Sequence, residues 1–217
     1  MAESSRKKLI VAGCSMAHGA ELDSPYMSKR NIDLSWSKQI ADHLDCDLLN
    51  VALCACSNDW IFHTAMDNAI QHKHDIHSMI VMWTWPTRLT WKCDDIIYHL
   101  QSSFFCAHVD PYNHKNIQFA DAPPGITIQA ESQAHANELG TIHPYMIRNM
   151  IDDKQFAQNQ IRYSQALQGY CDSQGIALYQ THPDKYSDIG TWQKETRHPN
   201  LEETKLIGKR MLSEFYA

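Results

Sequence analysis

Residues 7–19 read KKLIVAGCSMAHG, and this stretch decides the fold. The apolar run from Leu9 to Ala12, bounded by lysines and a glycine, is typical of a short buried strand. Gly13, Cys14 and Ser15 follow at once, so a serine lies on a tight turn at the end of that strand. In an open parallel sheet, reactive side chains gather at the carboxyl ends of the strands. The turn that carries Ser15 is therefore the first candidate for a functional site.

Strand and helix patterns alternate along most of the chain. The run at 78–85, SMIVMWTW, is the most strand-like and is expected at the centre of the sheet, with Pro86 ending it. Further strands are expected at 47–53 and 176–180, and helices follow capping residues and apolar stripes near 33–44, 57–74, 152–175 and 201–215. This alternation predicts a three-layer α/β/α sandwich with a central parallel sheet.

The chain is expected to form one domain over residues 1–217, with an insertion at about 89–149. Within that range, 116–120 and 125–130 alternate apolar and polar residues on either side of two prolines, which suggests a small hairpin. The segment that would shape a binding pocket is therefore the one least readable from sequence.

Composition excludes several classes of protein. The net charge is −6 and only residues 6–8 form a basic cluster, which argues against nucleic acid as a partner. Residues 1–8 are polar, and no apolar run approaches the roughly 18 residues of a membrane span, so we expect a cytoplasmic protein without membrane contact. Seven cysteines is an odd number, and the simplest expectation is that they are reduced.

Three further segments are expected to reach the same edge of the sheet as Ser15. They are 50–59 and 83–88, which follow the second and third strands, and 195–200, which precedes the last helix. The last segment contains His198, and a histidine distant in sequence can serve as the base that activates a serine hydroxyl.

These segments resemble the conserved blocks of the SGNH/GDSL hydrolases, in particular small SGNH-like proteins of bacteria and their phages. The family's G-D-S-x-x-x-G block corresponds to residues 13–19, its Asn-containing strand end and turn to 50–59, and its D-x-x-H block to 195–198, followed by Pro199 and a helix. The correspondence covers about 8–88 and 150–217. It implies the flavodoxin-like fold of that family.

The resemblance also implies roles for individual residues. Ser15 would be the nucleophile, His198 the general base and Glu195 the acid that orients the imidazole, with Asp188 as a substitute for Glu195. The backbone amides of Ser15 and Ala55 would form part of the oxyanion hole. The remaining donor would come from Thr84 or from the indole of Trp85.

The sequence departs from the family pattern in four places. Cys14 replaces an aspartate, and Glu195 replaces an aspartate that is one methylene shorter. Ala55 stands where the family has a turn glycine, which is tolerable at negative φ but strained at positive φ. The family's G-x-N-D block, whose asparagine donates to the oxyanion, is replaced by WTWPTR at 83–88. Loss of one such donor typically lowers the rate about 10²- to 10³-fold.

The expected activity is hydrolysis of a small acyl ester, such as an acetyl group on a carbohydrate, through an acyl-serine intermediate, with no cofactor or metal. The alternative is a catalytically silent SGNH-like domain that binds or builds a structure, for example by self-association or within a phage particle. In the case of a phage-encoded protein, its location would be the virion.

Other groupings have simpler interpretations. His72, His74 and His77 have the close spacing of a metal cluster. They lie at a probable helix end, where a cationic side chain is favoured by the helix dipole, and this is the simpler interpretation. Cys54 and Cys56 lack the usual zinc spacing and are expected to be small buried residues. Cys14 could itself be a nucleophile, although it points differently from Ser15 in the turn. The tryptophans at 83, 85 and 91 belong either to the core or, for the last two, to a sugar-binding face.

Overall fold

The computed structural model describes residues 6–23, 28–93, 96–101, 104–108, 127–129, 133–150, 152–192, 195 and 198–217. Its main sheet has four parallel strands in the order β2-β1-β3-β8. The strands are β1 (Lys8–Gly13), β2 (Asp47–Asn50), β3 (Ile76–Met82) and β8 (Ala177–Thr181). The predicted α/β class with a central parallel sheet is therefore confirmed.

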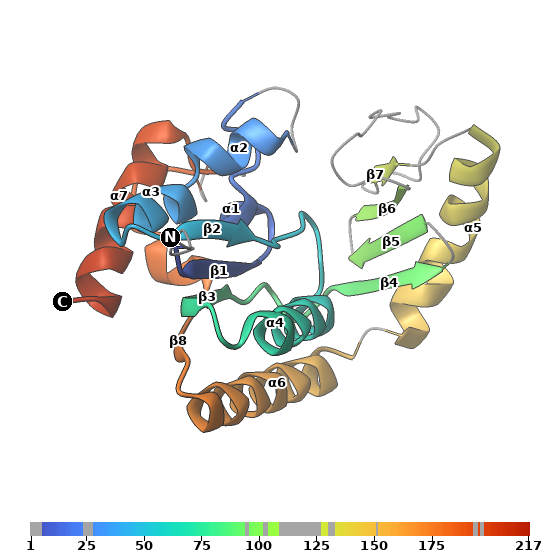
Figure 1. Ribbon diagram of the computed structural model, residues 1–217. Coiled ribbons are helices and arrows are strands. Elements are labelled where there is room, and N and C mark those ends of the chain that lie inside the picture. The colour runs from blue at the N-terminus through green and yellow to red at the C-terminus, as the bar shows by residue number, and fades with distance from the viewer. Residues whose placement is uncertain are drawn as a thin grey trace.

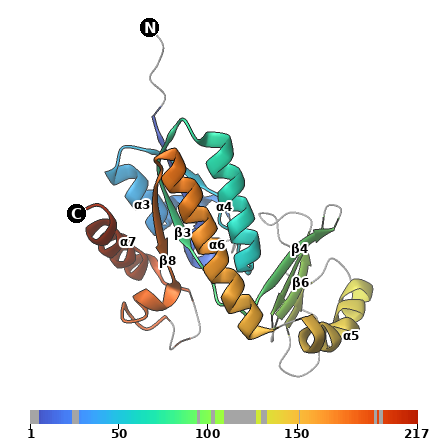
Figure 2. The same cartoon turned by 90° about the horizontal axis from the view of Figure 1, so that it is seen from below.

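Helices cover both faces of this sheet. Figures 1 and 2 show α3 and α7 on one face and α4 and α6 on the other. Their bounds are α3 (Trp36–His43), α4 (Asn58–His72), α6 (Asp153–Gln174) and α7 (Leu201–Phe215). β1 and β3 lie at the centre, and their apolar side chains, such as Leu9, Ile10, Met79 and Ile80, are completely buried. Burying both faces explains why these strands read as continuous apolar runs.

Two predicted strands are shorter than expected. β2 ends at Asn50 and β3 at Met82, three residues before the predicted ends at 53 and 85. The chain nevertheless stays beside the sheet, because Leu53 N–H donates to the Gly13 carbonyl at 3.0 Å and Trp83 N–H to the Thr181 carbonyl at 2.9 Å. These extensions lead directly into the loops at the carboxyl edge.

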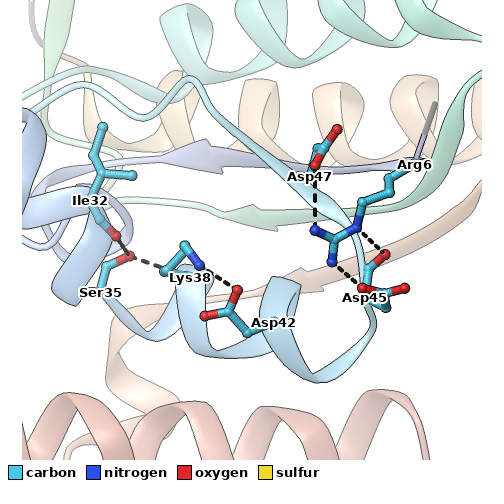
Figure 3. Close-up of polar contacts among 7 residues, drawn as sticks. All are labelled: Arg6, Ile32, Ser35, Lys38, Asp42, Asp45 and Asp47. Carbon is cyan, nitrogen blue, oxygen red and sulfur yellow. Dashed lines mark hydrogen bonds and ion pairs between the residues drawn. The ribbon is translucent and has the colours of Figure 1, made fainter. Parts of the chain in front are cut away.

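Capping residues place the helices. Ser35 caps α3: its hydroxyl accepts from Lys38 N–H and donates to the Ile32 carbonyl, as Figure 3 shows. Ser57 caps α4 in the same way, through Trp60 N–H. Asp152 caps α6, and Gly175 ends it in the left-handed conformation. The side chains of Ser35, Ser57 and Asp152 each accept from an amide that the first helical turn leaves without an intrahelical partner.

Surface ion pairs hold the start of the sheet. Arg6, just before β1, pairs with Asp45, and its guanidinium also lies 3.9 Å from Asp47 at the start of β2 (Figure 3). Lys38 pairs with Asp42 one turn along α3 (Figure 3). Exposed pairs of this kind contribute little to stability, typically about 0–1 kcal/mol each.

A second sheet occupies the range expected for the insertion, beside the main domain in Figures 1 and 2. Its order is β4-β5-β6-β7; β4, β5 and β6 pair antiparallel, and β7 runs parallel to β6. The elements are β4 (Leu89–Cys93), β5 (Ile96–Gln101), β6 (Phe104–His108), β7 (Thr127–Gln129) and α5 (Gln133–Met150). Residues 116–120 of the expected hairpin lie outside the described residues, and β7, in its other half, pairs with β6.

A buried polar contact joins the two sheets. The Ser57 amide donates to the Thr90 hydroxyl at 2.8 Å, and this hydroxyl lies 3.0 Å from Nδ1 of His99 on β5. Both Thr90 and His99 are buried. The second sheet is therefore anchored at the amino end of α4, next to the loops at the carboxyl edge of the main sheet.

Three short elements complete the fold. They are α1 (Ser15–His18), α2 (Lys29–Leu34) and the 3₁₀ turn η1 (Pro183–Tyr186). None of the helices formed by the described residues has the length and apolar character needed to cross a bilayer.

Candidate active site at the carboxyl edge of the sheet

Ser15 is the first residue of α1, immediately beyond β1. Cys14 precedes it as the N-cap, and its carbonyl accepts from Ala17 N–H at 3.0 Å and His18 N–H at 3.1 Å. Ser15 is 8% exposed, whereas Cys14 is 1% exposed. Across the described part of the chain, neither the amide nor the hydroxyl of Ser15 donates a hydrogen bond. Both residues are buried in this turn, and the serine is the more exposed of the two.

Glycine is required on steric grounds at both positions that frame the turn. A Cβ at Gly13 would lie 2.7 Å from Cβ of Ala17 and 2.9 Å from the carbonyl oxygen of Met82. Gly19 ends α1 at φ +85°, a left-handed conformation that favours glycine. Together they allow the chain to leave the central strand, form one helical turn and reverse within seven residues.

His198 is held by a carboxylate that the sequence did not single out. Its Nδ1 lies 3.0 Å from Oε2 of Glu21, and its backbone amide donates to the same oxygen at 3.1 Å. Glu21 follows Gly19 in the turn after α1, so this contact fixes the segment before α7 to the segment that carries Ser15. The distance makes this an ion-pair contact that does not meet hydrogen-bond geometry at Nδ1, so it places the carboxylate beside the ring without fixing which nitrogen carries the proton.

The contacts described for Glu195 and for its substitute Asp188 lead to residues other than His198, and the orienting role assigned to Glu195 stays a prediction. Glu195 is exposed, and its Oε1 accepts from the Thr191 hydroxyl at 2.7 Å. The substitute, Asp188, pairs with Arg210 through two contacts of 2.7 and 2.8 Å. Glu21 can approach the imidazole because its backbone adopts φ +67°, which turns the chain back toward His198.

The described residues contain no hydrogen bond between the Ser15 hydroxyl and His198. The roles of Ser15 and His198 as nucleophile and base therefore remain predictions. What the structure supplies is an imidazole oriented by a carboxylate that belongs to the Ser15 turn.

The turn at 54–56 lies against the same end of β1. The Gly13 carbonyl accepts from Leu53 N–H and from the Cys56 thiol, the latter at 3.4 Å. Ala55 lies between them at φ +61°, so its conformation is the strained one for a residue with a Cβ. Within the described chain the Ala55 amide donates no hydrogen bond. It is therefore available as a donor close to the start of α1.

Asn50 ties this second segment to α1. Its Nδ2 donates to the Ala17 carbonyl at 2.8 Å and to the Ser37 hydroxyl at 3.0 Å, while its Oδ1 accepts from Ala52 N–H. All the polar atoms of the amide are used inside the protein. Asn50 is therefore a positioning residue for the two loops.

Thr84 is not accessible as an oxyanion donor in this structure. Its side chain has no exposed surface, and its hydroxyl is buried without a hydrogen-bond partner. Asn58 at the start of α4 holds its backbone from both sides, donating to the Thr84 carbonyl at 2.8 Å and accepting from its amide at 2.7 Å. A ligand could reach the hydroxyl only after neighbouring side chains moved.

Arg88 is a second residue that the sequence analysis did not single out. Its guanidinium carbon lies 5.3 Å from the centre of the Trp85 ring, a cation–π contact, and the Trp85 ring meets His182 edge-on. The indole of Trp85 is therefore engaged on its face. The Nη1 atom of Arg88 is buried and has no hydrogen-bond partner among the described residues.

Electrostatics connect these groups. Burial lowers the pKa of His198 below its ordinary 6.5; the Glu21 carboxylate partly opposes this shift, and the Arg88 charge adds to it. Burial raises the pKa of the Cys54 thiol well above its ordinary value, and the charges of Arg88 and Glu21 act on it as well. Glu21, His198, Arg88 and the turn at 54–56 therefore form one cluster.

The pKa of His18, buried in α1, falls to about 4 because burial disfavours its charged form.

A pocket of about 260 Å³ adjoins this cluster. It lies where the amino end of α4, the segment between β3 and β4, and the first turns of α6 meet. Its lining combines polar and aromatic side chains: Asn58, Asp59, Pro86, Arg88, Leu89, Phe156, Asn159 and Tyr163. Arg88 is the residue shared by the pocket and the cluster around His198.

The other groupings from the sequence have structural partners. His72 lies 3.7 Å from Asp75, and His77 lies 3.1 Å from the Ser78 hydroxyl. In the described ranges, no three His, Cys, Asp or Glu side chains converge as ligands for a metal ion. Five cysteines are buried free thiols: Cys14, Cys46, Cys54, Cys56 and Cys171.

No protein-family model matches the sequence, and no curated protein matches it. Several solved structures are similar to it, and two of them are described here. A putative lipolytic protein of the G-D-S-L family from Desulfitobacterium hafniense has 13% identity and a TM-score of 0.39, over 94% of this chain and 96% of the other. An acetyl xylan esterase from Butyrivibrio proteoclasticus has 12% identity and a TM-score of 0.34, over 97% of this chain and 64% of the other. At such low similarity, the activity has to be argued from the site itself.

Proposed function

We propose that this protein is a serine-dependent hydrolase of small acyl esters, O-acetyl groups on carbohydrates among them. The observation that carries the proposal is the contact between Glu21 and His198. The contact joins the segment that carries His198 to the turn after α1, the short helix that begins at Ser15. Serine, imidazole and carboxylate in this order are the groups required for nucleophilic acyl transfer.

The proposed reaction begins with proton transfer from the Ser15 hydroxyl to Nε2 of His198 as Oγ attacks the ester carbonyl carbon. The negative charge moves to the carbonyl oxygen, where the amides of Ser15 and Ala55 can donate. When the tetrahedral intermediate collapses, the ester C–O bond breaks and the alcohol leaves with the proton from His198. Water, deprotonated by the same Nε2, then attacks the acyl-serine and regenerates the enzyme.

The competing candidate is a silent domain with a binding or structural role. Two observations favour it: the described residues show no Ser15–His198 hydrogen bond, and the Thr84 hydroxyl is inaccessible. Catalytic hydrogen bonds are often long in the absence of substrate, so the first observation does not decide between the candidates.

Steady-state hydrolysis of p-nitrophenyl acetate and of short-chain acyl esters tests the proposal. Ser15→Ala and His198→Ala should each remove nearly all activity, and the double variant should be little worse, because nucleophile and base act as one unit. Cys14→Ala, a matched variant at the neighbouring position, should remain active. Wild-type turnover no faster than that of Ser15→Ala contradicts the proposal and supports the silent domain. Activity that survives in Ser15→Ala but not in Cys14→Ala would move the nucleophile to the thiol.

A further inference from the structure

Arg88 has an environment that a structural arginine would not be expected to have. Its Nη1 atom is buried, and within the described chain no acceptor lies within hydrogen-bond distance and no carboxylate within ion-pair distance of the guanidinium. Buried charged groups in proteins are normally paired and hydrogen-bonded, because leaving them unpaired is costly. An unpaired buried N–H of a cation therefore indicates a place where an anionic oxygen is received.

The position of the guanidinium points to the reaction centre. Its charge acts on His198 on one side and on Cys54 and Cys56, the residues that flank Ala55, on the other. The Trp85 ring, 5.3 Å from the guanidinium carbon, limits where the group can move. Hydrogen bonds between Asn58 and Thr84 and between Ser57 and Thr90 hold the segment that carries Arg88 beside the turn that contains Ala55.

Two carboxylates near Arg88 are already engaged. Glu21 contacts His198 with its Oε2. Asp59 lines the same pocket as Arg88, but its Oδ1 accepts from the Tyr163 hydroxyl at 2.6 Å. Neither of these carboxylates forms an ion pair with Arg88.

We propose that Arg88 is a catalytic residue whose Nη1 donates to the oxyanion of the tetrahedral intermediate. The inference rests on the proposed esterase function and deepens it. As the Ser15 Oγ–carbon bond forms, charge moves onto the former carbonyl oxygen, and the guanidinium and the Ser15 and Ala55 amides receive it together. When the ester C–O bond breaks, the oxygen returns to a neutral carbonyl. Arg88 stays protonated throughout, because a guanidinium does not titrate in proteins.

This assignment accounts for the segment 83–88, which lacks an asparagine. In place of an amide side chain it supplies a cation, and a charge-assisted hydrogen bond is stronger than a neutral one. The donor acts on the transition state of any ester and so should affect kcat and not KM.

Kinetics of Arg88→Met and Arg88→Lys test the inference, with Arg148→Met on the exposed side of α5 as control. The substrates are neutral p-nitrophenyl acetate and the anionic hemisuccinate ester of p-nitrophenol. Arg88→Met should lower kcat about 10²- to 10³-fold on both esters with little change in KM. Arg88→Lys should retain part of the rate, and free guanidinium ions should restore part of the activity of Arg88→Ala.

A second readout separates catalysis from folding. Removing the positive charge should raise the pH midpoint of kcat/KM, because Arg88 lowers the pKa of His198. Unchanged kcat in Arg88→Met overturns the inference while leaving the proposed function intact. A loss confined to KM for the anionic ester also overturns it and makes Arg88 a binding group for a substrate carboxylate. Wild-type protein without Ser15-dependent turnover contradicts the inference and the proposed function together.

Discussion

The carboxylate of Glu21 contacts His198 twice, at 3.0 Å from its Nδ1 and at 3.1 Å from its backbone nitrogen, across a sequence separation of 177 residues. One carboxylate oxygen therefore orients the ring and anchors the loop that precedes α7. Since Glu21 lies in the turn just beyond α1, the contact ties the loop that carries His198 to that turn. The imidazole and the Ser15 turn are in effect one unit.

Glu21→Gln should lower kcat/KM by about 10²- to 10⁴-fold, the range typical of a contribution to general base catalysis. Glutamine keeps the shape of the side chain but does not stabilise the imidazolium that forms when Ser15 is deprotonated. Glu195→Gln, the matched change at the residue favoured by the sequence motif, should remain close to wild type. The two variants are compared under identical conditions on p-nitrophenyl acetate. The opposite ranking would restore Glu195 as the orienting acid.

The pH dependence of kcat/KM reports the protonation of His198. The base must be neutral, and burial holds its pKa below 6.5. The rate should therefore rise with pH through a midpoint below 6.5 and level off above it. In any residual activity of Glu21→Gln the midpoint should fall further, because Glu21 raises this pKa. A wild-type midpoint above 6.5 would contradict this account of the site.

His18 should make the protein sensitive to acid. Its pKa is about 4 in the folded state and 6.5 ordinarily, so between these values the unfolded chain binds more protons and stability falls as pH falls. The loss over this window amounts to about 3 kcal/mol at most. Urea unfolding at several pH values should show a shallower pH dependence for His18→Met than for wild type, whereas His43→Gln, at an exposed position, should match wild type. If the free energy of unfolding depends on pH equally in His18→Met and wild type, His18 is not the cause of the acid sensitivity.

Much of the main domain was predictable because short stretches of sequence determine its strands and the starts of its helices. Leu9 to Ala12 is apolar throughout because β1 is buried on both faces, and Ser57 and Asp152 signal helix starts by their side chains. The second sheet was not recognised because polar residues occupy its interior. Thr90 and His99 are buried and hydrogen-bonded to each other, which breaks the alternation expected of its strands.

The site was predictable only in part for a related reason. Ser15 and His198 belong to motifs at strand and helix ends, but the Glu21 contact joins segments far apart in sequence. The signal that could have found Glu21 is an acid two residues after Gly19, on the same edge of the sheet. Arg88 could not be identified from the sequence. Its proposed role depends on a buried Nη1 atom that has no hydrogen-bond partner, and only the coordinates show this.

Ala55→Gly should stabilise the protein without loss of activity. At φ +61° an alanine pays a steric cost of about 1–2 kcal/mol, which glycine avoids at the expense of greater freedom in the unfolded chain. The net gain in the free energy of unfolding should be up to about 1 kcal/mol. Ala55→Val should destabilise, since a β-branched residue tolerates this conformation less well. Urea denaturation of both variants measures the effect, and a strongly destabilised Ala55→Gly would show that the methyl group contributes packing that outweighs the strain.

The central claim, that Ser15 is an activated nucleophile, is tested most directly by reaction with a fluorophosphonate. The reagent requires an activated serine but no matching acyl group, so it does not depend on knowing the substrate. Intact-mass and peptide mass spectrometry of the folded protein should show one phosphonyl adduct, located on Ser15. The adduct should be absent from Ser15→Ala and should form far more slowly in His198→Ala. Folded wild-type protein that remains unlabelled, or an adduct on a different residue, would contradict the account.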